Sequence, residues 1–176
     1  NGIRHANGRY IALLDADDVW EPIFLESQLA LMQKHNATLV YGSHKRIDEN
    51  NNECLSPFIV PEHVTYTDIL KTCSISCLTG LYDSKQYGKI YLNEEFRSLR
   101  DDHIYWLEIL KKCGEAWGNK EIIASYRILS TSTTHNKLKV IIPQFKVYYK
   151  CEKLGLIKSI YYLMNWAFYG FLKYRK

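Results

Sequence analysis

Several features that would assign this sequence to a special class are missing from it. Its 176 residues hold five cysteines at wide spacings and no Cys-x-x-Cys pair. This argues against a disulfide framework or a structural zinc site and favours reduced cysteines in a cytosolic setting. No secretory signal pattern and no internal repeat are visible. The formal net charge is only +4, with 24% charged residues, so we expect no nucleic-acid partner.

Length and hydrophobic content suffice for one core. The chain is 47% hydrophobic, which is typical of one domain or part of one. Its first residue, Asn1, is not Met, and the chain opens inside a patterned segment, so we expect it to be part of a longer protein. Short apolar runs alternate with helical patterns, which indicates an α/β fold.

The patterns place the expected elements along the chain. A helix should close at Gly8, and another should begin at Glu21-Pro22 and bury one stripe. A third should be capped by Thr65 or Thr67, and a fourth should span 101–112. Strands are expected at 10–14, 37–42, 74–82 and 121–129, with a turn at 48–52 and a loop at 55–64. The helix that begins at Glu21-Pro22 should bury Leu25, Leu29 and Met32. A long helical region should follow residues 130–134, and Pro143 should kink or break it.

The most informative stretch is an apolar strand that runs into three carboxylates. Residues 11–14 predict a strand buried on both faces, and Asp15, Asp17 and Asp18 follow it. Asp15 and Asp17 alternate along the chain, so they share a face and repel each other unless a cation lies between them. Hard divalent cations such as Mg²⁺ or Mn²⁺ suit such a site and complete their shell with water and a phosphorylated substrate. The alternative is that Asp17 or Asp18 only caps the next helix.

A second candidate lies at the start of the predicted helix 101–112. Asp102, Trp106, Ile109 and Cys113 share one helix face, so Asp102 should point toward the core or a cleft, while Asp101 should point elsewhere. A carboxylate in a cleft beside a bound substrate suits general-base catalysis. Capping the helix and compensating its dipole is an equally good explanation on spacing alone.

The C-terminal segment carries a separate signal. Residues 159–172 hold no charge and many aromatic side chains, but are too short for a membrane span of ~20 apolar residues. Basic residues flank both ends, so residues 154–176 resemble a helix in a membrane interface. Packing against the chain's own domain or a partner is the alternative. The predicted apolar face comprises Ile157, Ile160, Tyr161, Met164, Phe168 and Phe171, and the opposite face comprises Lys158, Tyr162, Asn165, Tyr169 and Lys173.

Taken in order, these motifs resemble glycosyltransferase family 2, with its GT-A fold, and in particular the bacterial teichuronic-acid and capsular-polysaccharide type. The resemblance covers nearly the whole chain. Its motifs are Asn1-Gly2-Ile3, Ala6-x-Gly8-x-Tyr10-Ile11, Leu14-Asp15-Ala16-Asp17-Asp18-x-Trp20, Asp48, Thr65-Tyr66-x-Asp68, Cys77-Leu78-Thr79, Arg100-x-Asp102-x-x-x-Trp106-Leu107, Leu110-Lys111-Lys112, Tyr126-Arg127 and Asn136-Lys137.

The resemblance implies an inverting transfer of a sugar from a nucleotide-sugar donor to the hydroxyl of a sugar or lipid-linked acceptor. Asp17 would bind Mn²⁺ or Mg²⁺, Asp15 the donor ribose or the metal shell, and Asp102 would be the catalytic base. A location on the inner face of the bacterial plasma membrane follows if residues 154–176 bind there. Supporting residues would be Asp18, Arg100, Asp101, Trp106 and Arg127, and the acceptor region would be Cys77, Leu78, Thr79 and Gly80.

Two departures from the family pattern matter. Many members carry a histidine where this chain has Leu129, although His135 is near in sequence. The family's first nucleotide-binding strands would lie before residue 1. We therefore expect residues 1–135 to be the C-terminal part of a GT-A catalytic domain, residues 136–176 a helical extension, and the isolated 176 residues to be inactive.

Two other functions remain open on the sequence alone. An apolar strand followed by Asp-x-Asp also occurs in phosphatases of the haloacid-dehalogenase type, which would release phosphate from simple esters. A membrane-attached binding module would keep the fold without the chemistry and would show no metal-dependent binding of a nucleotide sugar.

Overall fold

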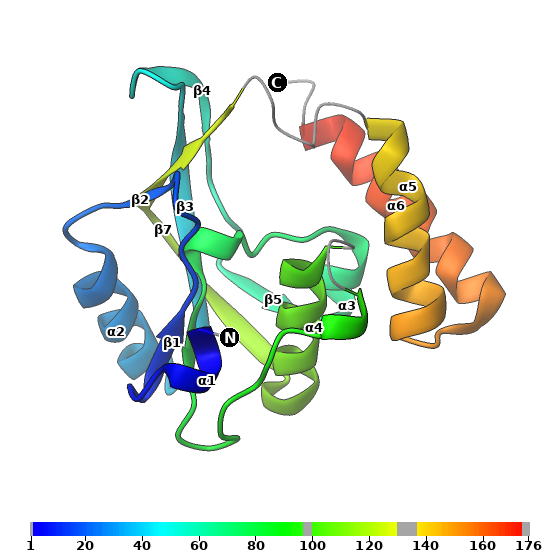
Figure 1. Ribbon diagram of the computed structural model, residues 1–176, viewed down its shortest axis with the longest axis horizontal. Helices are drawn as coiled ribbons and strands as arrows, with labels where there is room; N and C mark the ends of the chain where they lie inside the picture. The colour runs from blue at the N-terminus through cyan, green and yellow to red at the C-terminus, as the bar shows by residue number, and fades with distance from the viewer. Residues whose placement is uncertain (1, 97–99, 130–136, 174–176) are drawn as a thin grey trace.

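A twisted mixed sheet forms the centre of the protein. The structure, a computed structural model, describes residues 2–96, 100–129 and 137–173. Helix α2 lies against one face of the sheet, α3 and α4 cover the other, and α5 and α6 pack together beyond α3 (Figure 1). This arrangement confirms the predicted α/β class. The expected division between residues 135 and 136 falls outside the described residues and stays a prediction.

The sheet has the order β1-β6-β3-β7-β2, with β4 added to β3 and β5 to β7. Within the described residues, the central pair β3 and β7 is parallel and the other strand pairs are antiparallel. Strand β1 pairs with β6 alone in the described part of the chain. The strands are β1 (Tyr10–Ala12), β2 (Val19–Trp20), β3 (Leu39–Ile47), β4 (Glu53–Phe58), β5 (His63–Thr65), β6 (Leu81–Asp83) and β7 (Glu115–Arg127).

Helices α3 and α4 carry the signals that the sequence predicts, whereas α1 ends at His5, before the expected stop at Gly8, and α2 begins at Phe24, after the expected start at Glu21-Pro22. Helix α3 starts at Thr65, whose backbone N–H donates to the Asp68 carboxylate at 3.0 Å. Helix α4 has acidic residues in its first turn and ends at Gly114, which has a φ of +83°. The helices are α1 (Gly2–His5), α2 (Phe24–His35), α3 (Tyr66–Lys71), α4 (Asp101–Cys113), α5 (Lys137–Lys146) and α6 (Gly155–Lys173), with 3₁₀ turns at Cys77–Thr79 and Glu94–Phe96 and a π-helical turn at Val147–Cys151.

Four other expected elements differ from the structure. The strand predicted at 10–14 stops at Ala12, and Leu14 is 44% exposed, so residues 11–14 are not buried on both faces. The loop predicted at 55–64 contains most of β4 and part of β5. The strand predicted at 74–82 is a turn followed by β6. Pro143 lies inside α5, and the irregularity follows it, in the π-helical turn.

The core lies mainly between the sheet and α4. Trp106 and Ile109 of the predicted stripe are fully buried there, and Ile104, Tyr105 and Leu107, which lie outside that stripe, are buried as well. The predicted stripe of α2 is wrong at one position: Leu25 is 52% exposed, and the buried residues are Phe24, Gln28 and Met32. Among the described residues, no helix combines the length and apolar character that a membrane span requires.

Candidate active site

The acidic stretch forms a tight loop between β1 and β2. The backbone N–H of Asp18 donates to the Asp15 carbonyl at 3.1 Å, which closes a turn at the end of the strand. Asp15 and Asp17 are exposed on this turn, whereas Asp18 is buried with 8% of its surface exposed. The turn therefore presents two carboxylates to solvent and directs the third into the protein.

Arg127, at the end of β7, holds this loop in place. Its backbone N–H donates to Asp18 Oδ1 at 2.8 Å, and its Nε donates to the Asp17 carbonyl at 2.8 Å. The other guanidinium nitrogens donate to the Asp48 carbonyl at 2.7 Å and to Asn51 Oδ1 at 2.8 Å. The Arg127 side chain thus joins the acidic loop to the turn between β3 and β4. These hydrogen bonds fix the position of the loop that carries Asp15 and Asp17.

The carboxylates of the loop and of α4 belong to one electrostatic site. Burial raises the pKa of Asp15, and the charges of Asp17, Asp102 and Asp101 raise it further. Burial likewise raises the pKa of Asp18 to about 6, although the hydrogen bond from the Arg127 backbone opposes this rise. The end of β1 and the N-terminus of α4 therefore bring several carboxylates close together, and none of the ion pairs among the described residues includes Asp15, Asp17, Asp101 or Asp102.

The two acidic residues in the first turn of α4, Asp101 and Asp102, lie near this site. Asp102 heads the stripe that continues into Trp106, and it is half-buried, as is Asp101. The charge of Asp101 also raises the pKa of Asp15, and Asp101 lines a neighbouring cavity of about 460 Å³. The expectation that its side chain points away from the acidic loop stays a prediction. Ile3, Arg4, Leu13, Tyr91 and Asn93 also line this cavity. The helix begins near the acidic loop, so both carboxylates of its first turn add to the negative charge there.

The turn at residues 77–80 borders the same carboxylates. Burial raises the pKa of the Cys77 thiol, and Asp15 and Asp102 add to this effect, so the thiol stays protonated. Trp20 Nε1 donates to the Leu78 carbonyl at 2.7 Å, and the fully buried Gln28 donates to the Thr79 carbonyl at 2.8 Å. The backbone of the predicted acceptor region is therefore fixed from β2 and α2.

Gly80 allows α4 to approach this turn. A Cβ at Gly80 would lie 2.3 Å from Cη2 of Trp106, and the indole is fully buried. The ring cannot withdraw without displacing the core. The close packing of Gly80 on Trp106 thus sets the distance between the turn and the helix that carries Asp102.

We expect Gly80→Ala to lower the free energy of unfolding by about 1–3 kcal/mol, because the added methyl overpacks a filled core. Chemical denaturation of the purified protein measures this change. Gly170→Ala is the matched control, since a Cβ at Gly170 meets nothing within 4 Å and alanine suits the helix interior. Equal effects of the two substitutions would contradict the packing argument.

The acidic loop fits a divalent cation that the substrate helps to hold. Asp15 and Asp17 offer exposed oxygens in an excess of negative charge, and Asp18 Oδ2 is buried without a hydrogen-bond partner. Among the described residues, no three ligand atoms converge here within metal-binding distance. The protein would therefore supply two carboxylates, and water and a diphosphate would complete the shell.

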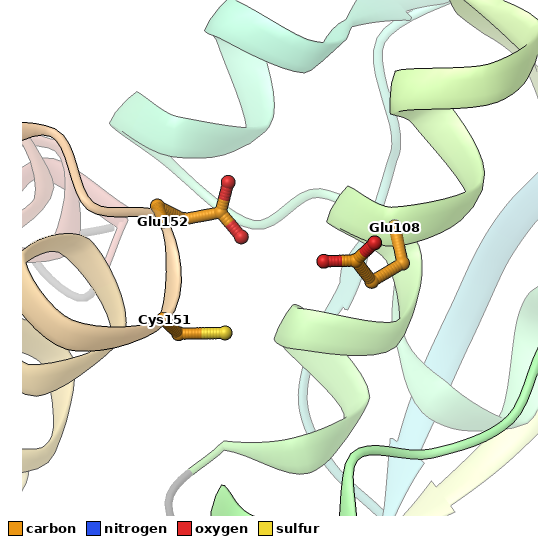
Figure 2. Close-up of side chains that lie close together, drawn as sticks. All are labelled: Glu108, Cys151 and Glu152. Carbon is orange, nitrogen blue, oxygen red and sulfur yellow. The ribbon is translucent and has the colours of Figure 1, made fainter.

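A second acidic cluster, distant from the loop in sequence, is a structural contact. Figure 2 shows Glu108 of α4 opposite Cys151 and Glu152 of the π-helical turn. Lys111 Nζ lies 2.8 Å from Glu108 and 2.9 Å from Glu152, and the Tyr66 hydroxyl donates to Glu152. Burial also raises the pKa of the Cys151 thiol to about 11. Lys111 bridges the two carboxylates, so the cluster joins α4 to the turn that precedes α6.

Some predicted or expected site residues remain without a described role. Leu129 is half-buried, and His135 lies outside the described residues. Two contributions were missed: the buried amide of Gln28 and the contacts of Asp48 and Asn51 with Arg127. For Gln28, the sequence signal was a glutamine on the side of α2 that also carries Met32.

Comparison with curated proteins finds relatives along nearly the whole chain. The protein "UDP-Glc:alpha-D-GlcNAc-diphosphoundecaprenol beta-1,3-glucosyltransferase WfgD" of Escherichia coli is 35% identical, over 98% of this chain and 66% of its own length. TuaG of Bacillus subtilis (strain 168), named for teichuronic acid biosynthesis, is 34% identical over 94% of this chain and 65% of its own length. The chain thus spans slightly less than two thirds of these relatives.

Solved structures show the same fold at lower identity. TarS 1–349 of S. aureus in complex with UDP-GlcNAc aligns with a TM-score of 0.58 at 15% identity, over 84% of this chain and 45% of that one. The sequence model of "Glycosyl transferase family 2" matches residues 1–97, which is more than half of the chain. On this match and the identities of its relatives, the chain belongs to glycosyl transferase family 2.

Proposed function

We propose that the full-length protein transfers a sugar, with inversion, from a nucleotide-sugar donor to an acceptor hydroxyl during synthesis of a cell-envelope polysaccharide. The observation that carries this proposal is the turn after β1, which Arg127 holds in place and which presents Asp15 and Asp17 to solvent. Family membership supports the reaction class and counts against the phosphatase alternative.

The exposed pair Asp15 and Asp17 would hold Mn²⁺ or Mg²⁺ together with the donor diphosphate. A cation bound there supplies positive charge for the leaving diphosphate. The names of the relatives support a UDP-sugar donor, since WfgD is named for UDP-Glc and TarS was solved with UDP-GlcNAc. Arg127 keeps the loop in the shape that presents both carboxylates.

Asp102 would take the proton from the attacking hydroxyl. Inversion requires the acceptor to approach from the side of the sugar opposite the leaving group, so the base must be separate from the donor carboxylates. Asp102 lies in the first turn of α4, a helix whose other residues are largely buried in the core. Nearby, the turn at residues 77–80 would border the acceptor.

The acceptor would be a sugar, either free or carried on a lipid diphosphate. WfgD and WfaP of Escherichia coli are both named for a GlcNAc-diphosphoundecaprenol acceptor, which supports the lipid-linked form. Such an acceptor lies in the membrane, so we propose that the protein works at the inner face of the bacterial plasma membrane.

Calorimetric titration of the full-length protein with UDP-sugars, with and without Mn²⁺, tests this function. We expect metal-dependent binding of at least one UDP-sugar, and transfer of its sugar to a synthetic lipid-diphosphate-linked GlcNAc followed by mass spectrometry. Binding without metal dependence and without product would favour the non-catalytic module. Phosphate release from simple esters, with no use of nucleotide sugars, would favour the phosphatase.

A further inference from the structure

The charge of this chain is unevenly distributed. Residues 136–176 hold nine of the 23 basic residues but only one of the 19 acidic ones, Glu152, so this segment has a formal charge of +8 and the rest of the chain −4. Glu152 is itself paired with Lys111 and hydrogen-bonded by Tyr66. The C-terminal helices therefore carry a positive field that their own carboxylates do not balance.

The same segment exposes a continuous apolar face on α6. Ile157 is 84% exposed, Met164 68% and Phe168 60%, and these residues follow one another at helical spacing. Ile160, Tyr161 and Phe171 are exposed between and beyond them. A row of large apolar side chains of this length is rare on a free surface and marks an interaction site.

The opposite side of α6 is packed, so the exposed face does not result from a detached helix. Tyr162 and Leu163 contact the main hydrophobic core, and Ser159 is fully buried. This corrects the predicted polar face, which had included Tyr162. Helix α6 lies beside α5 at the edge of the molecule remote from α2 (Figure 1). Its apolar stripe consequently points away from the protein.

We propose that this face of α6, which we call the α6 face (Ile157, Ile160, Tyr161, Met164, Phe168 and Phe171), docks on a bilayer that contains anionic phospholipids. Exposed lysines at positions 150, 153 and 158 adjoin it, where lipid phosphates would meet them. Apolar residues on one side, aromatic rings and adjacent lysines are typical of a helix that lies in the membrane interface. A second copy of the chain would bring two segments of charge +8 together, which disfavours self-association.

Docking would orient the candidate active site as well, a consequence that rests on the proposed function. The guanidinium carbon of Arg100 lies 5.8 Å from the centre of the Trp166 ring of α6. Arg100 directly precedes Asp101 and Asp102, and it holds a left-handed backbone conformation with φ 70°. Together with the contact between Lys111 and Glu152, which lies just before α6, this interaction joins the C-terminal segment to both ends of α4.

Vesicle flotation of the full-length protein tests the docking directly and requires no turnover. We expect it to float with phosphatidylcholine vesicles that contain about 30% phosphatidylglycerol, and to float less with pure phosphatidylcholine. The triple variant Ile157→Asn, Met164→Gln, Phe168→Gln should bind at least about tenfold more weakly. Replacing the lysines at 150, 153 and 158 with glutamine should weaken binding about fivefold per residue on anionic vesicles only.

Matched controls separate this effect from a general loss of hydrophobic or positive surface. Leu25→Gln, Leu55→Gln and Ile59→Gln change three apolar residues elsewhere that are each 52% exposed. Lys34→Gln, Lys85→Gln and Lys112→Gln remove three exposed lysines elsewhere. Both control variants should float like the parent. Flotation that is absent in the parent, or equal in the parent and the α6-face variant, would overturn the proposal. So would a dimer, seen by light scattering, that the α6-face substitutions dissociate.

Discussion

Replacing Asp17 with asparagine is expected to lower sugar transfer by the full-length protein about 10³-fold or more. Asp17 is exposed beside Asp15 in a site with excess negative charge, and it can offer a metal two oxygens where an asparagine offers one neutral oxygen. Losing the cation removes several kcal/mol of charge stabilisation from the leaving diphosphate, and each 1.36 kcal/mol is tenfold in rate. Steady-state transfer with a UDP-sugar measures the loss.

A chelator should reproduce this effect in the parent protein. We expect EDTA to abolish transfer and added Mn²⁺ or Mg²⁺ to restore it, whereas the Asp17→Asn variant should not recover at the same metal concentration. Glu26→Gln is a suitable control, because Glu26 is exposed on α2 and takes no part in the acidic site. Full activity of the parent in the presence of the chelator would exclude a metal at Asp15 and Asp17.

Elements governed by neighbouring residues were predictable from the sequence. Helix α4 has acidic residues in its first turn, lysines in its last and Gly114 after it, so its bounds agree with the prediction within one residue. Thr65 and Asp68 are three positions apart and cap α3 as expected. These signals act within one helical turn, so the sequence carries them without knowledge of the fold.

Contacts between distant segments were not predictable. Arg127 and Asp17 are 110 positions apart, and only the parallel pairing of β3 with β7 brings Arg127 beside the acidic loop and the Asp48 turn. Gln28 likewise is buried because the Thr79 carbonyl, 51 positions away, accepts its hydrogen bond. A polar residue on a helix gives no signal of such a partner. The predicted buried face of α2 therefore included Leu25, which is exposed, and left out Gln28, which is buried.

Replacing Asp102 with asparagine is expected to lower turnover by ~10²–10⁴-fold, the usual contribution of general-base catalysis. The substitution removes the proton acceptor and keeps the size of the side chain, so the donor and the metal should still bind. Trp106 and Ile109 lie on the same face of α4 as Asp102 and are fully buried. Their packing prevents the helix from rotating, so the position of Asp102 is fixed. Transfer rates, together with titration of the donor by calorimetry, measure turnover and binding separately.

Two further substitutions decide whether Asp102 is the base. Asp101→Asn keeps the neighbouring carboxylate and tests the charge of the first turn, and Glu95→Gln tests an exposed acid on the preceding 3₁₀ turn. Both should retain turnover within about tenfold of the parent, since loss of a nearby charge changes the field but leaves the proton acceptor in place. If Asp101→Asn or Glu95→Gln loses turnover while Asp102→Asn keeps it, the base is the other residue. Loss of donor binding in Asp102→Asn would instead make Asp102 a ligand, because a base that acts only on the acceptor hydroxyl leaves donor affinity unchanged.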